Sequence, residues 1–218
     1  DPQHPGLEVF SIHENPKHTN AASFYEAKTG KIIWGKRSSD AVRGLAADID
    51  PRYKGYEMWA FGEGLFGLWN TKGELISQRS PRSCNFAVWW DGDLLREILD
   101  RNYIAKWDWE NSTLKTLLVA DGCTSNNGTK ATPALCADIL GDWREEVIWR
   151  TFDNKELRIY ITTTPSKHRI FTLMHDPQYR LSVAWQNVGY NQPAQPGFYL
   201  GEGMDKLPTL NITTNRNK

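Results

Sequence analysis

The sequence has no excess of charge of either sign, and no segment of it carries a block of like charges. Its 218 residues include 26 basic and 26 acidic side chains, which give a formal net charge of zero. Nucleic acids and anionic membranes attract basic surfaces, so this charge pattern favours neither partner. The chain also has no apolar run near the ~20 residues that a membrane-spanning helix requires. We therefore expect no nucleic-acid partner and no membrane span.

Cysteine is scarce as well. Cys84, Cys123 and Cys136 are the three cysteines of the chain. None of them stands in a CxxC or Cys/His spacing that would indicate a zinc site. A pair between Cys123 and Cys136 is one alternative, but an odd count leaves one thiol over. The sequence therefore predicts no disulfide framework.

What the sequence does contain is a pattern that returns four times. Each copy has an acidic turn, a short gap and a glutamate that opens a hydrophobic strand; the copies are residues 1–10, 47–59, 90–99 and 137–149. The first two copies superpose at an offset of 49 residues, and Asp48, Asp91 and Asp138 follow at spacings of 43 and 47. A period of this length, with several strands per repeat, is typical of a β-propeller with one blade per repeat.

We therefore predict an all-β fold, a partial β-propeller of antiparallel blade sheets that extends over residues 1–218. The first residue already falls inside a repeat, so the chain is expected to start in mid-blade and to be a fragment of a longer protein. The predicted repeats lie near residues 1–46, 47–89, 90–136 and 137–207.

The segments between the acidic turns favour strands and hairpins. Hairpins are predicted over 22–34 and 65–77, with turns at 28–30 and 71–73, and a third is predicted around the turn at 110–112. Residues 94–101 and 156–164 are interpreted as strands, and residues 174–180 and 186–200 as loops. Aromatic side chains are abundant, with ten Trp, eight Tyr and eight Phe, and we expect most of them to pack between sheets.

The acidic turns are candidate calcium sites. Calcium binds six to eight oxygen ligands, commonly from a compact loop and a later carboxylate. The alternative is that Asp and Gly only build tight turns through side-chain hydrogen bonds. Four copies favour calcium in at least one turn, because turn formation alone should not require the later glutamate. The candidate ligands are Asp48, Asp50 and Glu57; Asp91, Asp93 and Glu97; Asp138, Asp142 and Glu146; and Glu8 with His13.

The candidate site for chemistry is the polar loop 121–133, in which Lys130 is the single cation. The backbone of Gly128 and the polar side chains beside it offer hydrogen-bond donors to an oxygen-rich ligand. The alternative is a solvated loop between blades. Arg43 occupies the corresponding loop one turn earlier. His175 lies in a non-repeating segment, and a single histidine there is more often structural than catalytic.

Six segments of the chain, in order, resemble the rhamnogalacturonan lyases of polysaccharide lyase family 11. They are residues 44–53, 88–97, 125–130, 137–146, 174–180 and 184–193. The resemblance implies an eight-bladed β-propeller that binds several calcium ions and cleaves the rhamnose–galacturonic acid backbone of pectin by β-elimination. This chain would supply about four of the blades as the C-terminal half, and the N-terminal blades would be its partner. The resemblance also implies a secreted, periplasmic or cell-surface protein.

The resemblance assigns individual roles. Asn127, Gly128, Thr129 and Tyr190 would contact the saccharide. Lys130 and Arg43 would be the cationic pair at the cleavage point. The chemistry of β-elimination agrees with this: a guanidinium can neutralise the uronate carboxylate, and a lysine whose pKa is lowered can remove the adjacent proton.

Two rival classes remain. One is a non-catalytic calcium-binding propeller module that binds pectic polysaccharide without cutting it. The other is a quinone-dependent dehydrogenase, which residues 26–34 echo weakly. In either case four blades leave open sheet faces, so self-association of the fragment, head to tail, is a further alternative.

Overall fold

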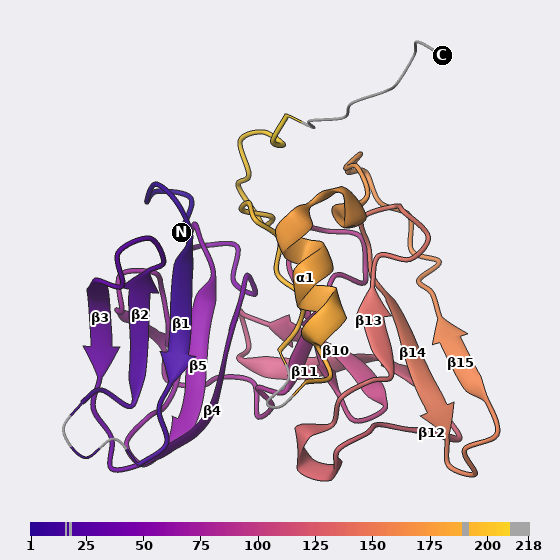
Figure 1. Ribbon diagram of the computed structural model, residues 1–218, viewed down its shortest axis with the longest axis horizontal. Helices are drawn as coiled ribbons and strands as arrows, with labels where there is room; N and C mark the ends of the chain where they lie inside the picture. The colour runs from indigo at the N-terminus through magenta and orange to yellow at the C-terminus, as the bar shows by residue number, and fades with distance from the viewer. Residues whose placement is uncertain (16, 18, 189–191, 210–218) are drawn as a thin grey trace.

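The computed structural model describes residues 1–15, 17, 19–188 and 192–209. It contains four antiparallel sheets that follow one another along the chain (Figure 1). The first sheet has the order β1-β2-β3, with β1 (Glu8–Ile12), β2 (Ala22–Glu26) and β3 (Ile32–Lys36). The second has the order β4-β5-β6-β7, with β4 (Ala41–Ala47), β5 (Glu57–Gly62), β6 (Leu68–Trp69) and β7 (Leu75–Ser77).

The third and fourth sheets continue the series. The third has the order β11-β10-β9-β8, with β8 (Phe86–Val88), β9 (Glu97–Asp100), β10 (Tyr103–Asp108) and β11 (Thr113–Val119). In the fourth, the central strand β14 (Glu146–Thr151) pairs with β12 (Cys123–Thr124), β13 (Leu135–Ala137) and β15 (Leu157–Tyr160). The all-β prediction is therefore confirmed, with antiparallel sheets throughout.

The three predicted hairpins are also confirmed. Gly30 and Gly73 adopt φ angles of 71° and 76° at two of the turns, a conformation that favours glycine. The strand predicted over 94–101 is shorter than expected, since it begins at Glu97. The strand predicted over 156–164 likewise covers only Leu157–Tyr160.

The strand before each acidic turn pairs with the glutamate strand that follows the turn. The register joins Ala47 to Glu57, Val88 to Glu97 and Ala137 to Glu146. The boundaries of the sheets therefore differ from those of the sequence repeats. Each repeat begins at an acidic turn, whereas each of these sheets begins one strand earlier, with β4, β8 or β13. In the first sheet, no described strand stands before β1 in this way.

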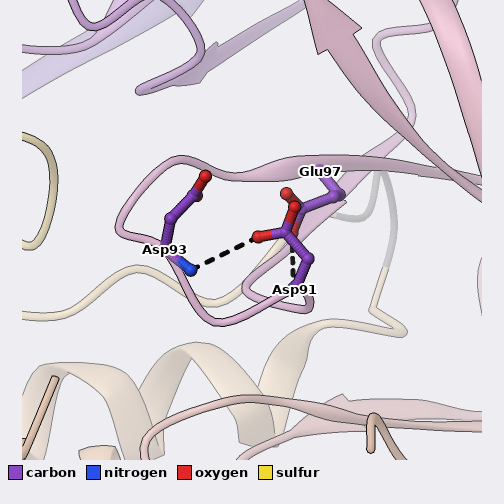
Figure 2. Close-up of side chains that lie close together, drawn as sticks. All are labelled: Asp91, Asp93 and Glu97. Atoms are coloured by element: carbon purple, nitrogen blue, oxygen red, sulfur yellow. Dashed lines mark hydrogen bonds between the residues drawn. The ribbon is translucent and has the colours of Figure 1, made fainter. Parts of the chain in front are cut away.

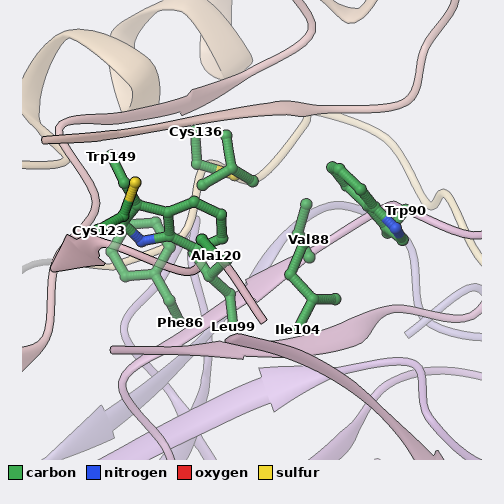
Figure 3. Close-up of a cluster of buried hydrophobic side chains, with 10 residues drawn as sticks. Phe86, Val88, Trp90, Leu99, Ile104, Ala120, Cys123, Cys136 and Trp149 are labelled. Carbon is green, nitrogen blue, oxygen red and sulfur yellow. The ribbon is translucent and has the colours of Figure 1, made fainter. Parts of the chain in front are cut away.

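The core consists of apolar layers between successive sheets. Met58 lies in the layer between the first and second sheets, and Trp59 in the layer between the second and third. Between the third and fourth sheets, Phe86, Leu99 and Trp149 pack together with Cys136 (Figure 3). Large side chains on both faces of a strand are thus buried, because each inner sheet is covered on both sides. The expectation that most aromatic residues pack between sheets holds only in part: ten aromatic side chains of the described residues are buried, and others, such as Phe66, Phe152 and Trp185, are exposed.

The segment after the fourth sheet departs from the predicted loop. A short 3-10 helix, η2 (Leu173–His175), leads into α1 (Pro177–Trp185). Asp176 accepts hydrogen bonds from the backbone N–H groups of Gln178 and Tyr179, and Pro177 occupies the first helical position. An acidic N-cap followed by proline is a start signal for a helix that the sequence already contained. Over the described residues, α1 and the other helical turns lack the length and apolar content needed to cross a membrane.

All three cysteines are buried free thiols. The alternative of a Cys123–Cys136 disulfide is therefore not realised. Burial raises the pKa of the Cys84 thiol to about 12, and an uncharged buried thiol behaves as a small apolar side chain.

Candidate functional site

The candidate residues divide between the two ends of the sheet stack. β4, β8 and β13 each run toward an acidic turn, at Asp48, Asp91 and Asp138 respectively. The opposite ends of these strands carry Arg43, Asn85 and the loop that contains Lys130. Since a strand rises about 3.3 Å per residue, the seven residues of β4 separate the two ends by roughly 20 Å. The predicted cationic pair and the predicted calcium turns are thus separate sites.

The loop before β13 is a compact, closed turn. Backbone hydrogen bonds of 2.7 and 3.2 Å join Asn126 and Thr132 across its base. Between them, Gly128–Lys130 form one 3-10 turn, flanked by Asn127 and Ala131 with φ angles of 58° and 49°. Residues with a side chain adopt this left-handed conformation at a cost of about 1–2 kcal/mol. The loop geometry therefore depends on contacts with the rest of the protein.

Arg150 supplies part of that support, although no pattern in the sequence indicates this role. Its Nε donates to Asn126 Oδ1 at 2.9 Å, and one of its Nη atoms donates to the carbonyl of Ser125 at 3.1 Å. The exposed side of the loop then presents Asn127, Gly128 and Thr129 to solvent. These are three of the four residues expected to contact saccharide. The fourth, Tyr190, lies outside the described residues.

Arg43 is half-buried on β4, beside a tight contact between the first two sheets. A Cβ atom at Gly44 would lie 2.6 Å from side-chain carbons of Ile12, so glycine is needed for this approach. The Arg43 guanidinium donates a hydrogen bond to Oδ1 of Asn85. Asn85 in turn donates to the carbonyl of Thr129 at 3.1 Å. The structure therefore brings Arg43 and the Lys130 loop together, through a residue that sequence reasoning missed.

Arg43 also lines a groove. It has a volume of about 1030 Å3 and lies between β1, β4 and the C-terminal residues 192–208. Its lining includes Arg43, Glu14 and apolar side chains such as Phe10 and Met58. A groove of this size is large enough for a ligand of several sugar units or for a strand of protein.

His13 is also at the Arg43 end of the stack. β1 runs from Glu8 to Ile12, so Glu8 and His13 lie at opposite ends of this strand. Five strand residues span roughly 16 Å, which exceeds the reach of any single ion. The prediction that His13 joins Glu8 in one metal site is therefore wrong. His13 instead shares a 3.1 Å hydrogen bond with the hydroxyl of Tyr25.

The recurring glutamate has a structural function in each complete turn. One carboxylate oxygen of Glu57 accepts the backbone N–H groups of Ile49 and Asp50, both at 2.9 Å. Glu97 does the same for the turn at Trp90 and Asp91, at 2.8 and 3.3 Å. Glu146 accepts from the backbone N–H groups of residues 139 and 140 in the third complete turn. The expectation that turn formation alone would not require this glutamate is thus wrong, because the carboxylate closes the turn.

One acidic turn brings three carboxylates together. Asp91, Asp93 and Glu97 have oxygen atoms that all lie within 4.8 Å of one another (Figure 2). The ammonium of Lys106 lies among them, 2.5 Å from Asp91, 2.6 Å from Asp93 and 3.0 Å from Glu97. Burial, which outweighs the nearby ammonium, raises the pKa of Glu97 to about 8. Three carboxyl groups thus surround a single ammonium, and their oxygen atoms are ligands that fit a hard cation.

The first complete turn presents a different arrangement. Asp48 Oδ1 and Glu57 Oε1 are buried, and neither has a hydrogen-bond partner among the described residues. Burial raises the pKa of Asp48 to about 8, although Tyr199 and the backbone of Glu202 donate to its other oxygen. Burial also raises the pKa of Glu57 well above its usual range, and the nearby Asp48 carboxylate adds to the effect. Buried oxygen atoms without partners are costly, so a cation here would satisfy both.

The remaining candidates do not converge in this way. Asp50 pairs with Arg52 at 2.6 Å, and Asp142 pairs with Arg144. Both oxygens of Asp138 accept backbone N–H groups, from Gly141 at 2.7 Å and from Leu173 at 2.7 Å. Within the described part of the chain, Asp91, Asp93 and Glu97 are the acidic group with metal-ligand spacing.

Comparison with known proteins identifies the family. Residues 1–210 match the family described as the C-terminal domain of rhamnogalacturonan lyase family 11. The chain belongs to this family. It is 56% identical over 215 residues to the rhamnogalacturonan endolyase YesW of Bacillus subtilis. The aligned region covers 98% of this chain and 34% of YesW. It is 51% identical over 222 residues to the rhamnogalacturonan exolyase YesX of the same organism. Here the aligned region covers 95% of this chain and 36% of YesX.

The family 11 fold is seen in solved structures. The crystal structure of YesW superposes on this chain with a TM-score of 0.93. The family 11 rhamnogalacturonan lyase of Bacillus licheniformis also has a TM-score of 0.93, at 60% identity, and covers 98% of this chain and 36% of that one. The chain spans about a third of the length of the curated relatives it matches.

Proposed function

We propose that the chain is the C-terminal part of a rhamnogalacturonan lyase that cleaves the rhamnose–galacturonic acid backbone of pectin by β-elimination. The observation that carries the proposal is the contact of Arg43 with the Lys130 loop through Asn85. Arg43, a permanent cation, is thereby linked to the loop that carries the Lys130 side chain, and elimination beside a uronate carboxylate needs a cation and a base. The 56% identity to an endolyase supports the same activity.

Each residue then has a defined part in the reaction. The Arg43 guanidinium binds the uronate carboxylate and stabilises the charge that builds up on it in the transition state. The side-chain nitrogen of Lys130 takes the proton from the adjacent carbon. The electron pair of that C–H bond forms a carbon–carbon double bond, and the glycosidic oxygen leaves with the electrons of its own bond. Asn127, Gly128 and Thr129 orient the sugar from the exposed side of the loop, and Tyr190 completes the saccharide contacts.

Calcium is proposed as the metal of the acidic turns. Asp91, Asp93 and Glu97 would hold one ion, and Asp48 with Glu57 would hold part of a second. Bound calcium would neutralise these buried carboxylates. Because Asp48 follows Arg43 by five residues, roughly 16 Å along β4, these ions would stabilise the fold without contacting the reacting carbon.

The four sheets are proposed to be consecutive blades of an eight-bladed propeller. The same backbone hydrogen bond links successive turns: the N–H of Arg96 donates to the carbonyl of Asp48, and that of Glu145 donates to Trp89. A constant relation between neighbours is what a ring of blades requires. The outer faces of the stack also expose apolar residues, Val9 and Ile32 at one end and Ile159 at the other. We propose that the remaining blades of the protein cover these faces.

We propose a secreted, periplasmic or cell-surface location, because the proposed substrate is a cell-wall polysaccharide. The test of the function is the ultraviolet absorbance of the unsaturated product, followed while the full-length protein is incubated with rhamnogalacturonan and calcium. A rise in absorbance is expected. Saccharide binding without any rise would overturn the lyase proposal and favour a non-catalytic module that binds pectic polysaccharide.

A further inference from the structure

We propose that Asn85 is a positioning residue for the lyase reaction, with its amide fixing the position of Arg43 relative to the loop that carries Lys130. The inference rests on the proposed function, and it adds to the site a residue that contacts neither proton nor carboxylate. Asn85 is half-buried and lies directly before β8. It is therefore anchored by a strand of the third sheet.

The hydrogen bonds of Asn85 use both ends of its amide. Oδ1 accepts from the Arg43 guanidinium, which belongs to the second sheet. Nδ2 donates to the carbonyl of Thr129 at 3.1 Å, in the loop that leads into the fourth sheet. One side chain thus connects three neighbouring sheets at the end of the stack where the chemistry is proposed.

A third partner fixes the orientation of the amide. Nδ2 also donates to Asp100 Oδ1 at 2.8 Å. Asp100 ends β9, and its other oxygen accepts a 3.4 Å hydrogen bond from the Tyr103 hydroxyl. With a cationic donor on one side and two acceptors on the other, only one orientation of the amide satisfies all partners. Neither an aspartate nor an apolar side chain can accept from Arg43 and donate to Thr129 at once.

The loop itself makes this contact consequential. Asn127, Gly128 and Ala131 have φ angles of 58°, 53° and 49°, all in the left-handed region. A loop with this backbone strain keeps its shape only while outside contacts hold it. The bond from Asn85 to the Thr129 carbonyl reaches the middle of the strained segment, one residue before Lys130. Loss of this bond is therefore expected to change the distance between Lys130 and Arg43.

The test uses kinetics of the full-length protein. We expect Asn85→Ala and Asn85→Asp each to lower kcat about 10- to 100-fold, because misplacement of a reacting group by about 1 Å has that effect. The midpoint of thermal unfolding should change little, and Asn111→Ala, in the exposed turn between β10 and β11, should match the parent. In an Arg43→Ala background, Asn85→Ala should cost much less than it does alone, since the two residues act together.

The outcomes separate the two proposals. If the parent protein forms no unsaturated product, the proposed function fails. If the parent is active and Asn85→Ala leaves both kcat and KM within about twofold, the positioning role is overturned while the function stands. A crystal structure of Asn85→Ala gives a readout independent of activity: displacement of Arg43 or of the Thr129 carbonyl is expected, and unchanged positions of both would overturn the inference.

Discussion

The ammonium of Lys106 lies 2.5 Å from Oδ2 of Asp91 and within 3.0 Å of an oxygen of Glu97. Lys106 stands on β10, whereas Glu97 begins β9 and Asp91 lies in the turn before it. It is therefore a built-in cation for the acidic turn, and it neutralises part of the charge that a calcium ion would otherwise have to balance. Lysine and calcium are expected to act on the same three carboxylates.

The substitution Lys106→Met should separate these two roles. Without the ammonium, the carboxylates of Asp91, Asp93 and Glu97 repel one another, and we expect the metal-free protein to lose about 1–3 kcal/mol of its free energy of unfolding. Calcium should restore stability more strongly in the variant than in the parent. Urea unfolding with calcium and with a chelator measures both effects. Lys115→Met, on the exposed face of β11, is the control, and an equal response to calcium in all three proteins would contradict the prediction.

The buried pair Asp48 and Glu57 predicts a dependence of stability on pH. Burial raises the pKa of Asp48 from its usual 3.8 to about 8 in the folded protein. A carboxyl group with a raised folded-state pKa favours folding below its unfolded pKa and loses that contribution as pH rises through the folded value. The metal-free protein should therefore become less stable between about pH 4 and about pH 8.

Calcium should flatten this dependence, since a bound cation favours the ionised carboxylates. Asp48→Asn should flatten it in the metal-free protein, because the amide does not titrate. Asp108→Asn is the control, because Asp108 is exposed and its hydrogen bonds with Asn111 lower its pKa, which reverses the sign. Thermal unfolding across the pH range checks the prediction. A metal-free midpoint that rises steadily from pH 4 to pH 8 would be inconsistent with it.

The close contact between Gly44 and Ile12 predicts that a larger side chain at position 44 lowers both stability and kcat. A methyl group at position 44 would lie 2.6 Å from Ile12 carbons, so Gly44→Ala should destabilise the protein by about 1–3 kcal/mol through overpacking. Because Arg43 is the neighbouring residue on β4, kcat should fall as well. The double variant Gly44→Ala with Ile12→Ala should recover part of both losses. No recovery in either measurement would place the cause elsewhere.

The substitution Lys130→Ala tests the separation of the two ends of the stack. General-base catalysis contributes about 100- to 10,000-fold to a rate, so the rate of product formation by the full-length protein should fall by at least about 100-fold. Calcium content should stay unchanged, because the Lys130 loop and the acidic turn at Asp138 lie at opposite ends of β13. Metal analysis of the purified variant, beside its kinetics, checks this. Loss of metal in Lys130→Ala would show that the lysine has a different role.

Much of the fold could be predicted because its signals are local. The hairpin turns at Gly30 and Gly73 depend on φ angles that glycine adopts readily. The repeat of acidic turn and glutamate is likewise visible as a pattern. The helix α1 was missed although its start signal, Asp176 followed by Pro177, is local too. The irregular sequence around this segment favours a loop and obscures the cap signal.

The candidate site was only partly predictable. The sequence predicted Lys130 correctly in a polar loop, but the prediction of a loop at Arg43 is wrong, because Arg43 lies on β4. Nor could the sequence show that Asn85 connects the two segments. The sequence pattern also grouped His13 with Glu8, although the two residues lie at opposite ends of β1. A repeat pattern shows the order of residues along the chain but not how far apart an extended strand holds them.

The sequence by itself determined the strands, the turns, the repeat and the resemblance to a lyase family, since hydrogen bonding in hairpins and residue patterns involve neighbours along the chain. Only the tertiary structure decided which carboxylates meet. Glu57 closes its own turn, Lys106 reaches the Asp91 cluster from another strand, and Asp48 is buried under Tyr199 from the C-terminal segment. These contacts depend on how sheets and segments pack, and packing brings together residues whose separation in the sequence carries no signal of their contact.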